Sequence, residues 1–225
     1  MNPKSVLILA GMCAALWILK RIPTTLLMTR ATRQKLAEVG SHALSKLPEF
    51  VSLIRVEDPQ WLHEQLIRQQ ADPLLALGFR DVGVYRVDKM PDVLIRVLCQ
   101  PQTNVAAHIH DQRQRGVWTE MVTRYNDGST YSINTLPPTG LNRPDWFRVI
   151  QVSPATPTDK IYQRYLAQRP PDGIKPVAPS DVVREFEEVF HRLAVWRKEA
   201  GISAQEVANV AEKRIYKSKG NSASA

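Results

Sequence analysis

Residues 121–134 read MVTRYNDGSTYSIN, and they place the tripeptide Asn126-Asp127-Gly128 between two runs of alternating character. Alternation with a period of two is typical of a strand that buries one face. An Asp-Gly pair supplies the positive φ angles that a tight hairpin turn needs. The sequence therefore predicts two antiparallel strands joined at this turn.

The period of two extends towards the N-terminus as far as Phe79. Short links rich in proline, glycine and polar residues separate the runs, which is typical of an antiparallel meander. Strands are expected at residues 80–87, 92–99, 105–111, 116–125 and 129–135. We therefore predict an antiparallel sheet of about five strands.

Helical signals flank the sheet on both sides. Asp58-Pro59 predicts a helix start, because an N-cap acceptor precedes a proline at the first helical position, and Gly78 ends that helix. After an irregular, proline-rich link over residues 136–157, Thr158 or Asp159 is expected to cap a short helix. Sheet and helices in separate runs indicate an α+β fold, with helices from both ends of the domain packed on the sheet.

The longest predicted helix of the domain is capped by Ser180 and ended by Gly201, and Ser203 begins a shorter one. Its apolar residues recur at intervals of three and four, which is typical of a helix with one buried face. They are Val182, Val183, Phe186, Val189, Phe190, Leu193 and Trp196.

An uncharged run, Ser5–Leu19, lies near the N-terminus and is followed directly by Lys20 and Arg21. As a helix it is about 22 Å long, against roughly 30 Å of bilayer hydrocarbon, and flanking cations that reach the interface can close the gap. We predict a transmembrane anchor helix, and a cleaved signal peptide, an organelle presequence and a buried helix remain alternatives. The residues expected to insert are Val6, Leu7, Ile8, Leu9, Leu16, Trp17, Ile18 and Leu19.

Positive charge is concentrated at the two ends of the chain. Residues 1–48 hold seven Lys or Arg and one acidic residue, whereas residues 49–212 hold 19 basic and 21 acidic residues. A domain without a basic excess of its own argues against nucleic-acid binding. The cations expected to contact lipid and to orient the anchor, leaving the C-terminal domain in the cytoplasm of a single-pass membrane protein, are Lys20, Arg21, Arg30, Arg33 and Lys35.

The chain is thus divided into four predicted parts. Residues 1–23 form the membrane anchor, and residues 24–56 form a basic amphipathic juxtamembrane segment, helical over 29–47. Residues 57–216 form the α+β globular domain, and residues 217–225 form a disordered basic tail. With only two cysteines, one of them in the uncharged run, no disulfide framework is expected.

Three motifs of the domain resemble a known pattern. They are Leu77-Gly78-Phe79, Gly83-Val84-Tyr85 and the seven residues from Val122 to Gly128. In these motifs the chain resembles uncharacterised bacterial proteins that have an N-terminal hydrophobic segment and a small α+β domain. The resemblance implies a bacterial origin and carries no functional residue across.

His108-Ile109-His110 is the one cluster with the spacing of metal ligands. On a strand, both imidazoles point to the same face, where they can share a metal with a third group. Candidates for that group are Glu120, His63 and Cys99. Cys99 beside a histidine can also act as a nucleophile, although its apolar flanks favour a structural, buried thiol.

Two further sets of residues suggest ligand binding. Arg113, Arg115 and Arg124 can recognise an anion, and for Arg124 we favour a charge pair with a carboxylate on the neighbouring strand. Aromatic residues can line a ligand pocket, although on strands they more often form core. They are Trp118, Tyr125, Tyr131, Trp146 and Phe147.

No sequence motif of a common enzyme class is legible, so we expect no catalytic set and no cofactor. The function predicted is that of a membrane-anchored, non-catalytic domain that binds a protein partner or a small apolar ligand at the membrane surface. The alternatives are a membrane-tethered hydrolase or metalloenzyme that uses His108 and His110, and a lipid-binding domain. The membrane, a protein partner or a second copy of the chain are the expected partners, and nucleic acid is not.

Overall fold

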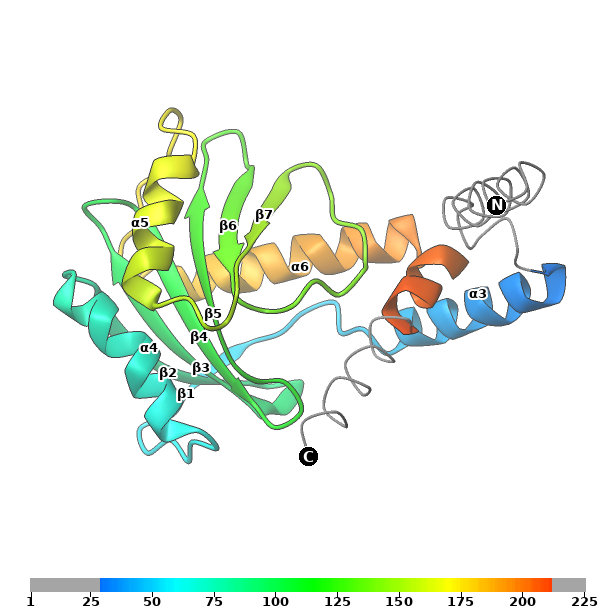
Figure 1. The fold of residues 1–225 in the computed structure, drawn as a ribbon, viewed down its shortest axis with the longest axis horizontal. Helices are drawn as coiled ribbons and strands as arrows, with labels where there is room; N and C mark the ends of the chain where they lie inside the picture. Colours follow the sequence, from blue (N-terminus) through cyan, green and yellow to red (C-terminus); the bar gives the residue numbers. More distant parts are fainter. Residues whose placement is uncertain (1–28, 212–225) are drawn as a thin grey trace, which may run out of the picture. The chain divides into compact units, whose positions relative to one another are not determined.

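The computed structural model describes residues 29–211 of the chain. Over this range the fold is α+β, built on one mixed sheet of seven strands (Figure 1). The chain divides into two compact units, one formed by residues 46–200 and the other by the segments before and after them. The predicted anchor at residues 1–23 and the tail at 217–225 lie outside the described residues.

The sheet lies in the unit of residues 46–200, and its strands follow one another in space in the order of the sequence. The first six strands pair antiparallel, whereas the last pair is parallel. The strands are β1 (Leu53–Arg55), β2 (Arg80–Val87), β3 (Met90–Gln100), β4 (Val105–Gln112), β5 (Gly116–Arg124), β6 (Thr130–Asn134) and β7 (Phe147–Gln151).

The prediction of an antiparallel sheet of five strands was therefore wrong in strand number and in type, although strands β2 to β6 match the five predicted runs. Strand β1 has three residues, too few for an alternating pattern to be recognised. Strand β7 follows a proline-rich link and pairs parallel with β6, so no hairpin signal marks it. Both missed strands form the edges of the sheet.

Helices cover both faces of the sheet (Figure 1). Helices α4 (Glu64–Ala76) and α5 (Thr158–Gln168) pack on one face, where Ile67, Leu74 and Tyr165 are fully buried against strands β3 to β6. Helix α6 (Val182–Ala200) covers the other face and packs against β3. Alternation along each strand therefore sends one residue to the α4–α5 face and the next to the α6 face.

The start of α4 differs from the prediction. Asp58-Pro59 lies in a bend, and the helix begins at Glu64 with His63 as its N-cap. The buried carboxylate of Asp111 replaces the expected cap: it accepts hydrogen bonds from the backbone N–H groups of Leu62 (2.7 Å) and His63 (3.0 Å). Asp111 also bonds His63 Nδ1 at 2.7 Å, so a strand residue holds the first turn of the helix in place.

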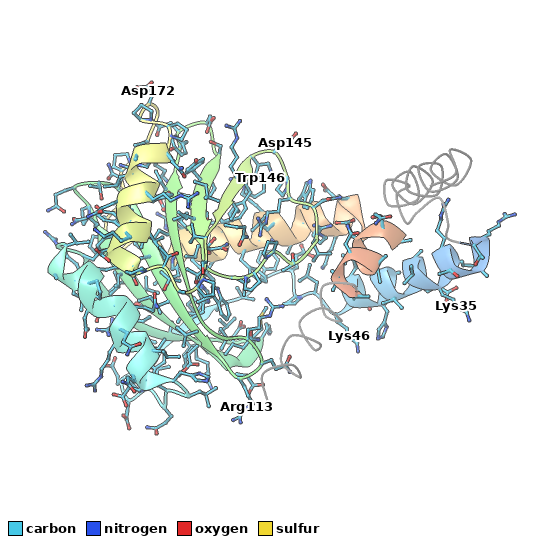
Figure 2. The ribbon with its side chains drawn as sticks, in the orientation of Figure 1. Lys35, Lys46, Arg113, Asp145, Trp146 and Asp172 are labelled. Carbon is cyan, nitrogen blue, oxygen red and sulfur yellow. The ribbon has the colours of Figure 1, made fainter. Side chains whose placement is uncertain are left out.

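The second unit contains helix α3 (Arg30–Ser45), which confirms the helix predicted over 29–47, and a helix at residues 204–211. Ser203 Oγ accepts the backbone N–H of Glu206, whose carboxylate accepts the N–H of Ser203, so this helix has the capping box of an N-terminus. The cations Arg30, Arg33 and Lys35 are exposed on α3. Figure 2 shows Lys35 on this helix. Among residues 29–211, no helix is long and apolar enough to cross a membrane.

Candidate ligand-binding chamber

Four polar residues face α6 from consecutive strands and stand side by side across the sheet. His108 on β4 pairs with Glu120 on β5, Glu120 pairs with Asn134 on β6, and Asn134 pairs with Gln151 on β7. Paired residues of neighbouring strands point to the same face. We call these four residues the polar row.

A cavity of about 420 Å³ lies between this face of the sheet and α6, and we call it the chamber. Most of its apolar lining comes from the segment before β1, from β2 and β3 and from α6, whereas its polar groups come from β4 to β6, the β4–β5 turn and the link before β7. Trp118, Val122, Leu136 and Phe147 add apolar surface on the polar side. The apolar wall includes Val51, Val87, Met90, Val93, Ile95, Phe186, Val189, Phe190 and Leu193, and the polar wall includes His108, His110, Gln112, Arg115, Glu120, Arg124, Asn134 and Arg143.

His108 and His110 both lie on the chamber face, with ring centroids 6.4 Å apart. His110 stacks on Trp118 at 4.4 Å, and His108 meets the ring of Phe186 edge-on at 5.1 Å. Their side chains are 2% and 7% exposed, respectively. Burial lowers the pKa of His110 to about 3 and that of His108 well below 6.5, so both imidazoles are neutral at pH 7.

Several buried atoms of the chamber face have no hydrogen-bond partner among the described residues. Those on residues that line the chamber are both ring nitrogens of His108, Nε2 of His110 and Oδ1 of Asn134, and the side-chain amide of Gln151 lies beside them on β7. Buried polar groups in native proteins are normally paired, because an unpaired one costs about 1–3 kcal/mol. Their concentration on one cavity wall marks this wall as a binding surface.

Glu120 is the acidic member of the polar row. Ser132 Oγ donates a hydrogen bond of 2.6 Å to its Oε1. Burial raises the pKa of Glu120 above 4.5, and the hydrogen bond from Ser132 and the charges of Arg124 and Arg143 offset this only in part. Both Glu120 and its partner His108 are thus biased towards their neutral forms.

Arg124 lies at the end of β5 and does not form the predicted charge pair with a carboxylate on the next strand. The register places Thr130 opposite it, and Arg124 Nη1 donates to Thr130 Oγ1 at 2.8 Å. Nη2 donates to the backbone carbonyl of Glu185 at 3.4 Å, and no ion pair of Arg124 is formed within residues 29–211. Burial lowers the pKa of Arg124 to about 10, so it remains a cation at neutral pH.

Helix α6 is fixed over the chamber by contacts with the link that leads into β7. The guanidinium of Arg192 lies 4.1 Å from the ring centroid of Trp146 and donates to the carbonyl of Gly128 at 2.9 Å. Figure 2 shows Trp146 beside β7. These contacts attach α6 to two separate loops, the turn before β6 and the link before β7.

The predicted third metal ligands lie in different places. Glu120 faces His108, and Cys99 shares the chamber face but is packed among Val97 and other core residues, where burial raises the pKa of its thiol to about 11. His63 lies beside Asp111. Because side chains alternate along a strand, Asp111 points to the face of β4 opposite to that of His108 and His110. Within residues 29–211, no three His, Cys, Asp or Glu side chains converge as a metal site would require.

The aromatic residues that were considered as the lining of a ligand pocket also lie in different places. Trp118 and Phe147 line the chamber. Tyr125 and Tyr131 instead donate hydrogen bonds to the carbonyls of Pro170 (2.8 Å) and Gln168 (3.1 Å), and so attach the sheet to the end of α5. Sequence reasoning missed Asn134 and the contribution of α6. The one sequence signal that could have indicated this polar face is the recurrence of polar residues at every second position of a strand.

A second hollow, of about 610 Å³, lies where β2 to β4 meet the segment before α4. Charged side chains such as Arg86 and Asp92 form most of its wall. Asp111, its buried acidic group, is fully engaged by Leu62 and His63. Figure 2 shows Arg113, another of its residues, at the outer tip of the β4–β5 turn. Because its buried charge is already satisfied, this hollow is a weaker candidate than the chamber.

Comparisons with protein-family models, with curated proteins and with solved structures find no match for this chain. The resemblance to uncharacterised bacterial proteins therefore stays a prediction.

Proposed function

We propose that the unit of residues 46–200 binds a small ligand with an apolar body and one polar end, and that it does so at a membrane surface without catalysing a reaction. The observation that carries the proposal is the set of unpartnered polar atoms on one wall of the chamber. A ligand that pairs with these atoms recovers hydrogen bonds that the protein alone leaves unmade.

The form of the chamber supports this ligand class. Small-molecule sites are cavities of about 300–1,000 Å³ with mostly apolar walls and a few convergent polar groups. The chamber has a volume of about 420 Å³, with most of its apolar lining on β2, β3 and α6 and most of its polar groups on β4 to β6. An elongated molecule with one polar end can therefore satisfy both walls at once.

The membrane part of the proposal rests on residues that the structure does not describe. The uncharged run from Ser5 to Leu19 and the basic residues after it support an anchor and a cytoplasmic domain. An anchor would raise the concentration of the domain near lipids and membrane partners. Protease protection of a C-terminal tag in intact and permeabilised cells tests it: a tag cut in intact cells would contradict the cytoplasmic orientation.

Binding is tested with the full chain reconstituted in phosphatidylcholine nanodiscs, with empty nanodiscs as the reference. Titration calorimetry with octanoate, octyl phosphate, 1-octanol and octylamine should detect one site per chain for at least one probe. Val93→Phe, which places extra volume on the chamber wall, should weaken that binding about tenfold or more. Exposed Ile54→Phe is the matched control. If no probe binds, the proposal is wrong.

The alternative of a metalloenzyme is tested on the same preparation. His108 and His110 share a face with Glu120, which is the observation that keeps this alternative open. Stoichiometric zinc or iron in the purified chain, lost in the variant His108→Ala with His110→Ala, would favour it. A metal-free chain that binds an octyl probe would favour the binding module.

A further inference from the structure

We propose that the polar end of the ligand is an anion, a carboxylate or a phosphate group, held by Arg124 and Arg143, with the apolar body lying over β2 and β3 beneath α6. This inference rests on the proposed binding function and specifies the chemical class of the ligand. It also assigns a role to Arg124, whose expected carboxylate partner does not exist in the described part of the chain.

The residues that line the chamber carry a net positive charge. Three arginines line it, Arg115, Arg124 and Arg143, and Glu120 is its only acidic lining residue. The two histidines are neutral at pH 7, because burial lowers the pKa of each. Even with Glu120 ionised, the chamber therefore carries a positive charge that no lining residue neutralises.

Arg124 has only neutral hydrogen-bond partners among the described residues. A guanidinium has five N–H donors and binds a carboxylate or phosphate in a bidentate manner. Arg124 uses two nitrogens on neutral oxygens, the hydroxyl of Thr130 and the carbonyl of Glu185. Buried charges in proteins are normally paired, because an unpaired charge loses its solvation without compensation. Arg124 is thus a half-buried cation whose strongest type of partner is not supplied by residues 29–211.

The two nearest carboxylates do not fill this role. Glu120 takes a hydrogen bond from Ser132, and burial raises its pKa, so its charge is disfavoured where it lies. The Glu185 carboxylate forms an ion pair with Lys175 at 2.9 Å, and only the backbone of Glu185 contacts Arg124. The charges of Glu120 and Glu185 raise the pKa of Arg124, but neither carboxylate forms an ion pair with it, and an anionic ligand in the chamber would supply that contact.

The neighbouring polar groups suit an anion as well. A neutral imidazole carries one N–H donor, and neither ring nitrogen of His108 is bonded within the described chain. Its side chain is 2% exposed and faces the chamber between Val97 and Glu120. Donors from His108 and Arg124 can therefore be directed at one set of ligand oxygens, while the apolar wall receives the rest of the molecule.

The test uses the full chain in phosphatidylcholine nanodiscs and compares four probes with the same octyl chain. Octanoate and octyl phosphate have anionic heads, 1-octanol a neutral head and octylamine a cationic head. A charged hydrogen bond contributes about 1.5–3 kcal/mol, so the tighter anion should bind about 10- to 100-fold more strongly than 1-octanol. Whichever of the two anions binds more tightly identifies the headgroup as carboxylate or phosphate.

Arg124→Gln and Arg143→Gln should each reduce this preference, with Arg124→Gln bringing the anion to within about threefold of 1-octanol. Arg148→Gln is the control, because Arg148 is exposed on β7 and pairs with Tyr131 of the opposite face. Thermal unfolding of each variant shows whether it is folded. If Arg124→Gln does not fold, the Arg143→Gln variant provides the test, because Arg143 is an exposed loop residue.

The outcomes separate the two proposals. Equal binding of all probes, or tighter binding of 1-octanol or octylamine, overturns the anion inference and leaves the binding function intact. No binding of any probe overturns both. An anion preference that survives Arg124→Gln and Arg143→Gln in folded variants overturns the assignment of the head to these arginines.

Discussion

Glu120 and His108 are directly paired across strands β5 and β4, and burial shifts the pKa of each towards its neutral form. The pair therefore presents hydrogen-bonding groups without a strong field of its own. Arg124, four positions along β5 from Glu120, keeps its charge. The chamber thus combines a polar floor with arginines at both ends of β5 and in the link before β7.

The two chamber histidines should make the protein sensitive to acid. Their pKa values are lowered in the folded chain, so below pH 6.5 the unfolded chain binds protons that the folded chain does not. Stability should then fall as pH decreases from 6.5 towards the lowered folded pKa, by up to about 1.4 kcal/mol per pH unit for each histidine. Urea unfolding between pH 7.5 and 4.5 measures this slope.

His108→Gln should flatten that slope relative to the original chain, and exposed His42→Gln is the control. A slope unchanged in His108→Gln would show that the acid sensitivity arises at other groups.

Glu120 should have the opposite effect on pH dependence. Because its folded pKa is raised above 4.5, the folded chain keeps a proton between 4.5 and the raised pKa that the unfolded chain has lost. The stability of the folded state therefore falls as pH rises through this window. Glu120→Gln retains an acceptor for Ser132 and removes the charge, so its stability advantage over the original chain should increase with pH and then level off.

Urea midpoints of Glu120→Gln and the original chain at pH 4, 6 and 8 test this, with Glu57→Gln at an exposed position as the control. A Glu120→Gln variant that loses stability as pH rises, relative to the original chain, would contradict the raised pKa.

Asp111 should be a large structural contributor at the start of α4. It is buried and accepts two backbone N–H groups together with Nδ1 of His63. Asp111→Asn removes the charge and one acceptor atom, and should lower the free energy of unfolding by about 1–3 kcal/mol. Hydrogen exchange should accelerate at the amides of Leu62 and His63.

Exposed Asp92→Asn is the matched control, with an expected change within about 0.5 kcal/mol. Unaltered exchange at Leu62 and His63 in Asp111→Asn would show that the hydrogen bonds to Asp111 do not stabilise the first turn of α4.

The contact between Arg192 and Trp146 should be measurable as a coupling energy. The guanidinium lies over the indole at 4.1 Å, at a partly exposed site where such contacts contribute about 0.5–1 kcal/mol. A double-mutant cycle with Arg192→Gln and Trp146→Leu should yield a coupling of that size. Arg184→Gln combined with Trp146→Leu should be additive, because Arg184 pairs with Asp181 and Glu188 instead. Zero coupling in the first cycle would show that this contact does not help to hold α6 in place.

The central strands were predictable because local rules govern them. Alternation and turn residues located β2 to β6 to within about two residues at each end. The Asn126-Asp127-Gly128 turn also formed, although only Gly128 has a positive φ, of 81°, and the loop runs from Tyr125 to Ser129. The edges were not predictable, because β1 is short and the β6–β7 pairing joins segments that no hairpin signal connects.

The site was visible from the sequence only in part. The alternation rule placed His108 and His110 on one face, and Glu120 was among the candidate neighbours. Asn134 and Gln151 complete the polar row only through the register of β5, β6 and β7, which short-range patterns do not determine. The same register explains why Arg124 faces Thr130 and not a carboxylate.

The unpartnered atoms of the polar row also affect how much of the protein accumulates in a cell. A ligand that pairs with them binds only the folded chain, so it stabilises that chain by an amount that grows with its concentration. Molecules that find no ligand are unfolded more often and are degraded sooner by quality-control proteases. With the proposed ligand, the steady-state amount of the protein would follow the supply of the molecule it binds, with no change in gene expression.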